Sequence, residues 1–137
     1  MSIVWKLKKW EELKKEELYE ILRLRSEIFI VEQECPYQDL DNKDIFSQHL
    51  FGKINNEIVC YTRVFLNEEP SIIGRLVVKK RFRNKGIGRE IMRRSINIIS
   101  KENVVFISAQ SYLKEFYESL GFIKKGKEYL EDGIIHI

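Results

Sequence analysis

The chain has 137 residues, and its 24 Lys and Arg against 21 Asp and Glu give a formal net charge of +3 at pH 7. Hydrophobic residues make up 44% and charged residues 33%, a balance that excludes a disordered chain, a collagen-like chain and a coiled coil. This length fits a single domain over residues 1–137. No apolar run approaches the roughly 20 residues of a membrane span or resembles a secretory leader, so we expect a cytoplasmic protein without membrane contact.

Few residues in the chain are suited to metal or redox chemistry. Cys35 and Cys60 form neither a disulfide framework nor a CxxC metal motif, and His49 and His136 are too few for a histidine-based site. We therefore expect no metal. We expect Cys35 to be a small buried hydrophobic residue, and its alternative role is that of a nucleophile forming an acetyl-enzyme.

The first half of the chain predicts a strand, a helical region and a hairpin. Residues 3–8 read as a short strand. Apolar residues at helical spacing predict one or two helices over residues 11–31, ended by Pro36. After a polar and acidic stretch, β-prone runs predict strands over 49–54 and 57–65, joined by an Asn-Asn hairpin turn.

The second half predicts alternating strands and helices. A β-prone run over 72–78 contains Gly74, which indicates a bulge or a close backbone approach. A glycine-containing turn leads into a helix over 88–101 and a buried strand over 104–109. A helix over 111–120 ends at Gly121, in the position of a C-terminal cap. The remaining strands are predicted within 122–125, 126–132 and 133–137.

This order of elements predicts an α/β fold in three layers, with a mixed β-sheet flanked by helices. The strand, turn, helix and second strand between residues 72 and 109 form a βαβ unit. Such a unit makes its two strands parallel and its crossover right-handed.

Charge is distributed unevenly along the chain. Residues 79–94 hold eight basic side chains against Glu90, whereas residues 32–44 hold five acidic side chains against Lys43. The basic segment suggests a polyanionic ligand, and the acidic segment permits a cationic partner. Either segment is alternatively a solvated face without a ligand.

The most specific motif is the turn from Arg83 to Gly88, which follows a strand and opens a helix. The first turn of a helix presents unpaired N–H groups and a positive dipole end, and Gly86 and Gly88 let an anion approach the backbone. The turn therefore predicts a phosphate site. It matches neither a Walker A loop nor the Rossmann fingerprint, and its alternative is a plain strand-to-helix loop.

The second feature is the segment Phe116-Tyr117-Glu118-Ser119-Leu120-Gly121-Phe122. Tyr117 lies one step off the apolar stripe of its helix. A phenol with an ordinary pKa near 10 suits a general acid that protonates a leaving thiolate. The alternative is a core tyrosine whose hydroxyl is hydrogen-bonded.

Together, the R-x-x-G-x-G turn and the Phe-Tyr-x-x-x-Gly-Phe segment resemble the GNAT superfamily of acetyl-CoA-dependent N-acetyltransferases. Four further segments resemble its ElaA-like subgroup: residues 31–41, 73–78, 108–110 and 130–137. The resemblance implies a GNAT-like sheet with a splayed parallel strand pair at the cofactor site.

The resemblance also implies a set of site residues. The Val78 N–H would stabilise the thioester oxyanion, and Tyr117 would be the general acid. Asn84 to Arg89 would wrap the pyrophosphate of acetyl-CoA. The full cofactor-binding set is Leu76, Val77, Val78, Arg83, Asn84, Lys85, Gly86, Ile87, Gly88, Arg89 and Gln110, the last standing where many members have Asn.

The implied reaction is direct transfer of an acetyl group to an amine in a ternary complex. The strand over 104–109 lacks the glutamate base of some members. The base or amine-steering candidates are therefore Glu32, Asp39, Asp41 and Asp44, whose alternative role is to cap and stabilise a loop.

Two rival functions remain open from the sequence. One is a GNAT fold that binds acyl-CoA without catalysis, and the less favoured one is a basic domain that binds nucleic acid. Trp5 or Trp10 permits a homodimer interface, although single surface aromatics need no such role.

Overall fold

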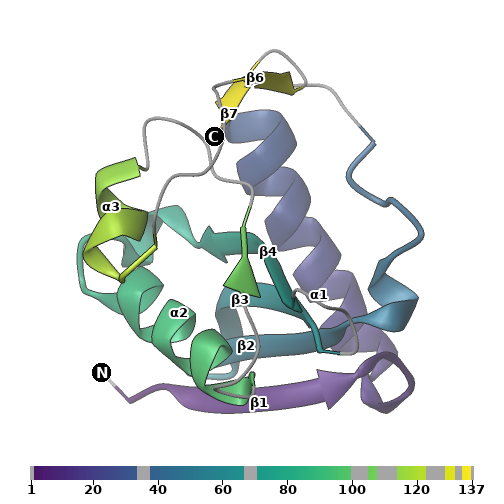
Figure 1. Ribbon diagram of the computed structural model, residues 1–137. Helices are drawn as coiled ribbons and strands as arrows, with labels where there is room; N and C mark the ends of the chain where they lie inside the picture. Colours follow the sequence, from purple (N-terminus) through teal and green to yellow (C-terminus); the bar gives the residue numbers. More distant parts are fainter. Residues whose placement is uncertain are drawn as a thin grey trace.

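The computed structural model describes residues 2–33, 38–66, 71–99, 105–107, 114–122, 129–131 and 134–136. Five strands form one sheet in the order β1-β2-β3-β4-β5 (Figure 1). The first four strands are successively antiparallel, and β5 runs parallel to β4. Their bounds are β1 Val4–Lys9, β2 Gln48–Ile54, β3 Glu57–Phe65, β4 Ser71–Val78 and β5 Val105–Phe106.

Helices cover both faces of this sheet, as the three-layer prediction requires. The helix α1 (Lys15–Ser26) lies on one face and α2 (Ile87–Ile98) on the other (Figure 1). The short helix α3 (Lys114–Ser119) follows β5, and β6 (Tyr129–Glu131) pairs with β7 (Ile134–His136) in a separate hairpin. The mixed, helix-flanked sheet predicted from the sequence is therefore confirmed.

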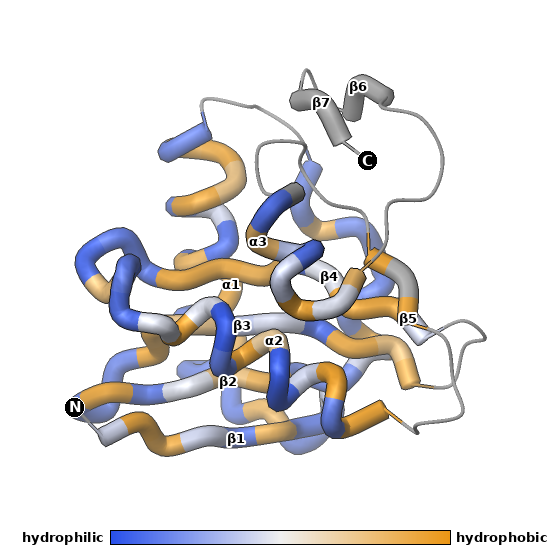
Figure 2. Tube along the Cα trace, turned by 60° about the vertical axis from the view of Figure 1, so that its left-hand side comes forward, coloured by the Kyte–Doolittle hydropathy of each residue, from blue (hydrophilic) through white to orange (hydrophobic). Residues whose placement is uncertain are grey.

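Separate hydrophobic clusters join each helix to the sheet. Ile21 and Leu24 of α1 pack with Phe51 and Tyr61, while Ile91 of α2 belongs to a second cluster with residues of β2 and β3. Figure 2, coloured by hydropathy, shows apolar stretches along the central strands, whereas β1 at the edge of the sheet is largely polar. Burial of these side chains supplies the main stabilisation of the fold.

The predicted helical region over 11–31 is divided into three pieces. A 3-10 turn, η1 (Trp10–Glu12), precedes α1, and a π-helical segment, η2 (Glu27–Glu32), follows it. Glu17 caps the start of α1 by accepting a hydrogen bond from the Lys14 N–H at 2.9 Å. Because π-helical turns are rare and concentrate at functional sites, η2 indicates that the end of this helical region lies near a functional site.

The β2–β3 hairpin forms as the sequence predicts. Asn55 and Asn56 both have positive φ, 49° and 64°, and join the two strands in a two-residue turn. Asparagine tolerates this left-handed conformation better than most residues, which explains why an Asn-Asn pair between two β-prone runs predicts a hairpin turn. The strand β3 has the predicted bounds.

Several predicted details are refined or fall outside the described residues. The helix α2 begins at Ile87, one residue before the predicted start. Phe122 belongs to no strand, and residues 123–125 of the strand predicted there lie outside the described residues. Cys35 and Gln110 lie outside the described residues. Within the described residues, no helix is both long and apolar enough to cross a membrane.

Candidate functional site

A one-residue bulge interrupts β4 next to Gly74, where the sequence predicts one. Arg63 pairs with Gly74, but Tyr61 pairs with Val77, so two residues of β4 lie opposite one residue of β3. The faces confirm this. Ile73 packs in a cluster with Met92 of α2, whereas Val77 packs in a cluster with residues of α1. Residues four apart in an unbroken strand point to the same face of the sheet. Because Ile73 and Val77 point to opposite faces, the bulge exchanges the two faces of β4 for the residues that follow it.

The bulge also turns the Val78 peptide away from β3. The Lys79 N–H donates to the Val59 carbonyl at 2.7 Å, which identifies Cys60 and Val78 as a pair without mutual ladder hydrogen bonds. The Val78 N–H and carbonyl therefore point to the opposite side of β4. Among the described residues, β5 pairs only with Ser71 and Ile72, at the other end of β4.

The predicted phosphate turn lies at the N-terminus of α2. Gly86 has a φ of +79° and a Cβ built there meets nothing within 4 Å, so the turn is open. The Glu90 N–H donates to the Gly86 carbonyl at 3.1 Å, and among the described residues no side chain caps the helix. The preceding amides, at the N-terminal end of α2, are thus those that a helix leaves for an anion.

Gly88 connects this turn to β4 and to α3. A Cβ built on Gly88 would lie 3.6 Å from Cγ2 of Val78 and 3.7 Å from Cζ of Phe116. Arg89 supports the same junction, because its Nη2 donates to the Ser119 hydroxyl at 2.9 Å. The glycine turn, the outward-facing Val78 peptide and the helix that carries Tyr117 are therefore neighbours in space.

The Phe-Tyr-x-x-x-Gly-Phe segment has a clear structural basis. The Phe122 N–H donates to the Tyr117 carbonyl and the Gly121 N–H to the Glu118 carbonyl, which is the Schellman end of a helix. Gly121 has the required positive φ of +99°. The Tyr117 and Phe122 rings pack edge to face at 6.1 Å. The motif thus fixes the half-buried Tyr117 next to Phe116.

Arg83 links the turn to the Val78 peptide and to η2. Its Nε donates to the Val78 carbonyl at 3.1 Å, and its two terminal nitrogens donate to the Glu32 carboxylate at 2.5 and 2.7 Å. These hydrogen bonds from Arg83 hold the pKa of Glu32 below its ordinary value. Of the four predicted carboxylates, Glu32 is therefore the one that shares a partner with Val78.

The other three carboxylates, Asp39, Asp41 and Asp44, form ion pairs with arginines on the α1 face of the sheet. Asp39 accepts from Arg25 at 3.0 Å and from Arg75 at 2.8 Å. Asp44 also accepts from Arg25, at 2.8 Å.

Asp41 belongs to the same cluster through Arg63. The two terminal nitrogens of Arg63 donate to its two carboxylate oxygens at 2.8 and 2.6 Å. These hydrogen bonds hold the pKa of Asp41 far below its ordinary value. This geometry favours the loop-stabilising role for the three aspartates.

Sequence reasoning did not identify the three arginines of this network. Arg25 is 0% exposed, and its position on the apolar stripe of a predicted helix is the one signal that it is buried and paired. Arg63 lies within a β-prone run, and Arg75 adopts a left-handed φ of 54°, which no local pattern indicates. Their partners are distant in sequence and therefore invisible to local rules.

His49 is fixed inside the same region. Its Nε2 lies 2.9 Å from the Asp44 carbonyl and its Nδ1 lies 2.5 Å from the Tyr61 hydroxyl. A carbonyl only accepts, so Nε2 carries the proton and Nδ1 accepts from Tyr61. Burial lowers the pKa of His49 and raises that of Tyr61, which keeps both neutral. These roles indicate a structural histidine.

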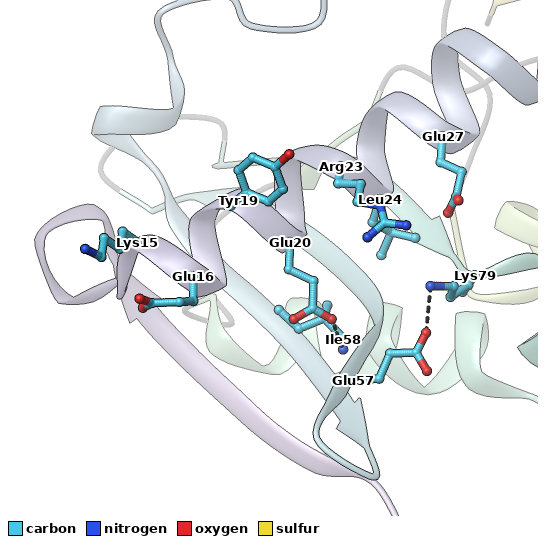
Figure 3. Close-up of a pocket in the computed structure, with 10 residues that line it drawn as sticks. All are labelled: Lys15, Glu16, Tyr19, Glu20, Arg23, Leu24, Glu27, Glu57, Ile58 and Lys79. Carbon is cyan, nitrogen blue, oxygen red and sulfur yellow. Dashed lines mark hydrogen bonds and ion pairs between the residues drawn. The ribbon is translucent and has the colours of Figure 1, made fainter.

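A separate pocket of about 610 Å³ opens between α1 and the start of β3 (Figure 3). Glu57 accepts from Lys79 at 2.6 Å, and Glu20 accepts from the Ile58 N–H at 2.6 Å. Tyr19 is 74% exposed at its rim. Lys79 follows Val78 directly, so the pocket lies beside the end of β4, although none of the predicted site residues lines it.

Comparison with known proteins identifies the family. A family model described as an acetyltransferase (GNAT) domain matches residues 12–137. Protein ElaA of Escherichia coli (strain K12) is 37% identical over 143 residues, covering 98% of this chain and 94% of that protein. The crystal structure of Escherichia coli ElaA matches with a TM-score of 0.92 at 35% identity, covering 98% of this chain and 97% of that one.

Two further solved structures match most of the chain. An acyl-CoA N-acyltransferase from Pseudomonas aeruginosa has a TM-score of 0.90 at 34% identity, covering 97% of this chain and 95% of that one. A structure described as a predicted acetyltransferase with acetyl-CoA, from Clostridium acetobutylicum, has a TM-score of 0.69 at 16% identity over 95% of each chain, and so shares the fold. The chain therefore belongs to the GNAT acetyltransferase family and is similar over nearly its whole length to ElaA.

Proposed function

We propose that the protein transfers an acetyl group from acetyl-CoA to an amine by direct attack in a ternary complex. The observation that carries this proposal is the Val78 peptide, whose N–H points away from β3 and which lies beside the open turn at Gly86 to Gly88. Such a geometry suits a thioester bound along β4 and phosphates bound at the helix end. Family membership supports acyl-CoA as the donor class.

In this proposal the backbone amides of Gly86, Ile87, Gly88 and Arg89 bind the pyrophosphate. The turn residues Asn84 and Lys85 and the Arg83 side chain border the same anion. Leu76 and Val77 extend the binding surface along β4. Gln110, whose amide suits a cofactor contact, stays a sequence-based proposal.

The chemistry follows from groups placed around one carbonyl carbon. The neutral amine attacks that carbon, and the Val78 N–H donates to the oxygen on which negative charge develops. The carbon–sulfur bond then breaks, and the Tyr117 hydroxyl gives its proton to the departing thiolate. The amine loses its own proton to solvent, and Glu32, whose carboxylate stays ionised beside Arg83, is our candidate for steering the cationic amine into the site.

Binding of acetyl-CoA is the first test. We expect calorimetric titration to show micromolar affinity, weakened by at least about tenfold in Gly86→Glu because a carboxylate at the helix end repels phosphate. The control, Asn97→Glu, adds the same charge near the other end of α2 and leaves the affinity unchanged. Absence of binding to acetyl-CoA and to desulfo-CoA in the wild type would refute the proposal.

Turnover is the second test, measured as thiol release from acetyl-CoA with a panel of small amines, peptides and lysine-containing substrates. We expect Tyr117→Phe to lower kcat by about a hundredfold while acetyl-CoA affinity is kept, because only the acid is lost. Tyr19→Phe, which alters an exposed tyrosine on α1, is the matched control. Equal turnover in Tyr117→Phe and wild type would remove Tyr117 from the mechanism.

A further inference from the structure

Arg75 holds an unusual backbone conformation at the position on which the candidate site depends. Its φ of 54° lies in the left-handed region, where a residue other than glycine, asparagine or aspartate is strained. Arg75 and Leu76 are the two residues that lie opposite Thr62 in the bulge. Such strain persists only where the surroundings enforce it.

The side chain of Arg75 is held by contacts around Asp39. The Nε of Arg75 donates to Oδ1 of Asp39 at 2.8 Å, and its Nη2 donates to the Asp39 carbonyl at 3.1 Å. The same Asp39 is held from the other side by Arg25, whose Nε donates to Oδ2 at 3.0 Å. Asp39 is 5% exposed and Arg25 is 0% exposed, so the end of the ion pair at Asp39 is buried.

The bulge determines which N–H group of β4 points away from β3. With it, Val77 is in the hydrogen-bonded ladder with Tyr61, and the Val78 N–H points outward. If β4 were regular from Gly74 onward, every following residue would exchange orientation, since the period of a strand is two residues. Val78 would then be in the ladder and Val77 outside it.

We propose that Asp39 and Arg75 are positioning residues for acetyl transfer, because their ion pair holds the β4 bulge and so keeps the Val78 N–H available to the thioester oxygen. The catalytic part rests on the proposed function. The structural part, that the ion pair holds the bulge, is independent of the proposed function. The two parts therefore have separate readouts.

The first experiment compares two variants that both remove the ion pair. Arg75→Gln keeps a side chain that disfavours positive φ, whereas Arg75→Gly removes the strain itself. Amide hydrogen exchange followed by NMR reads Val77 and Val78 individually. In Arg75→Gln we expect Val77 to exchange at least about tenfold faster and Val78 more slowly, with β2 amides unchanged. In Arg75→Gly we expect both amides to stay near their wild-type rates.

Three results would overturn the structural part. One is an unchanged pattern in Arg75→Gln. Another is an equal change in both variants. The last is uniformly faster exchange across β2 and β3, which would indicate only general destabilisation. Arg94→Gln, which removes the exposed ion pair between Arg94 and Glu90, controls for loss of an arginine as such.

The second experiment measures kcat and acetyl-CoA affinity in the same variants and in Asp39→Asn. We expect kcat to fall by about a hundredfold in Arg75→Gln, the effect of losing one oxyanion donor, and to recover largely in Arg75→Gly. Affinity falls less than kcat, because the phosphate turn is untouched while the surface along β4 changes. Unchanged kcat in Arg75→Gln would refute the positioning role. A wild type without acetyl-CoA binding would refute the proposed function instead, and the exchange result would still decide the structural part.

Discussion

Gly86 and Gly88 are close in sequence but serve different purposes. Gly86 is required by its backbone conformation and Gly88 by the space around it, and substitution of each residue distinguishes the two. Gly86 has a φ of +79°, so an alanine there is strained although there is space for its Cβ. A Cβ at Gly88 makes only ordinary contacts, at 3.6 Å and beyond.

We predict that Gly86→Ala lowers the free energy of unfolding by about 1 kcal/mol, whereas Gly88→Ala changes it by less than about 0.5 kcal/mol. Gly88→Ala instead weakens acetyl-CoA binding, because its methyl group occupies space beside Val78. Urea unfolding and calorimetry of both variants measure the two effects. A larger stability loss in Gly88→Ala than in Gly86→Ala would contradict this assignment.

His49 makes stability depend on pH near neutrality. Burial lowers the pKa of its imidazole in the folded state, so the unfolded chain binds a proton more readily. Stability from this group is therefore fully present above the unfolded pKa of about 6.5 and is lost as the pH falls.

We predict that the wild type loses stability between about pH 7 and 5, and that His49→Gln has a slope smaller by up to about 1.4 kcal/mol per pH unit. Glutamine keeps the ability to donate to the Asp44 carbonyl and accept from Tyr61. Urea unfolding across this range measures the slopes. Parallel curves for the two proteins would show that His49 does not titrate on unfolding.

At the scale of elements, the end of α3 controls the position of Tyr117. Gly121 has a φ of +99° and nothing within 4 Å of its built Cβ, so substitution there acts through the backbone alone. The described part of this helix, Lys114–Ser119, ends directly before this cap, so the cap lies within one turn of Tyr117.

We predict that Gly121→Ala lowers the free energy of unfolding by about 1 kcal/mol and lowers kcat more than acetyl-CoA affinity. Gly121→Asn is the milder control, since asparagine tolerates the left-handed conformation. Thermal unfolding and thiol-release kinetics are the measurements. Equal effects of alanine and asparagine would show that φ at this position is unimportant.

At the scale of the whole molecule, local signals predicted the fold and several of the elements that border the candidate site. The Asn55-Asn56 turn, the strand over 57–65 and the turn at Gly86 depend on residues that are neighbours in sequence. Their conformational preferences therefore act before any tertiary contact. The three-layer order follows from the same local elements, because a strand–helix–strand unit leaves few alternatives.

Contacts between distant residues were not predictable in this way. Asp39 and Arg75 are 36 positions apart, and Glu32 and Arg83 are 51 apart. The acidic segment permitted a cationic partner or a loop-stabilising role, and in the structure its three aspartates pair with three arginines of the protein itself. Local composition gives the sign of a segment's charge but not the partners that neutralise it.

The Asp39 anchor also has a consequence for the order in which the molecule assembles. Arg25, Asp39 and Arg75 belong to α1, to the segment before β2 and to β4, so their contacts close loops of 14 and 36 residues. Closing the longer loop, from Asp39 to Arg75, is entropically unfavourable until β3 and β4 are already paired. During synthesis, Arg25 and Asp39 leave the ribosome well before Arg75. We therefore expect the bulge, and with it the outward-facing Val78 N–H, to form late in folding, and under the proposed function a partly folded chain would lack acetyl transfer.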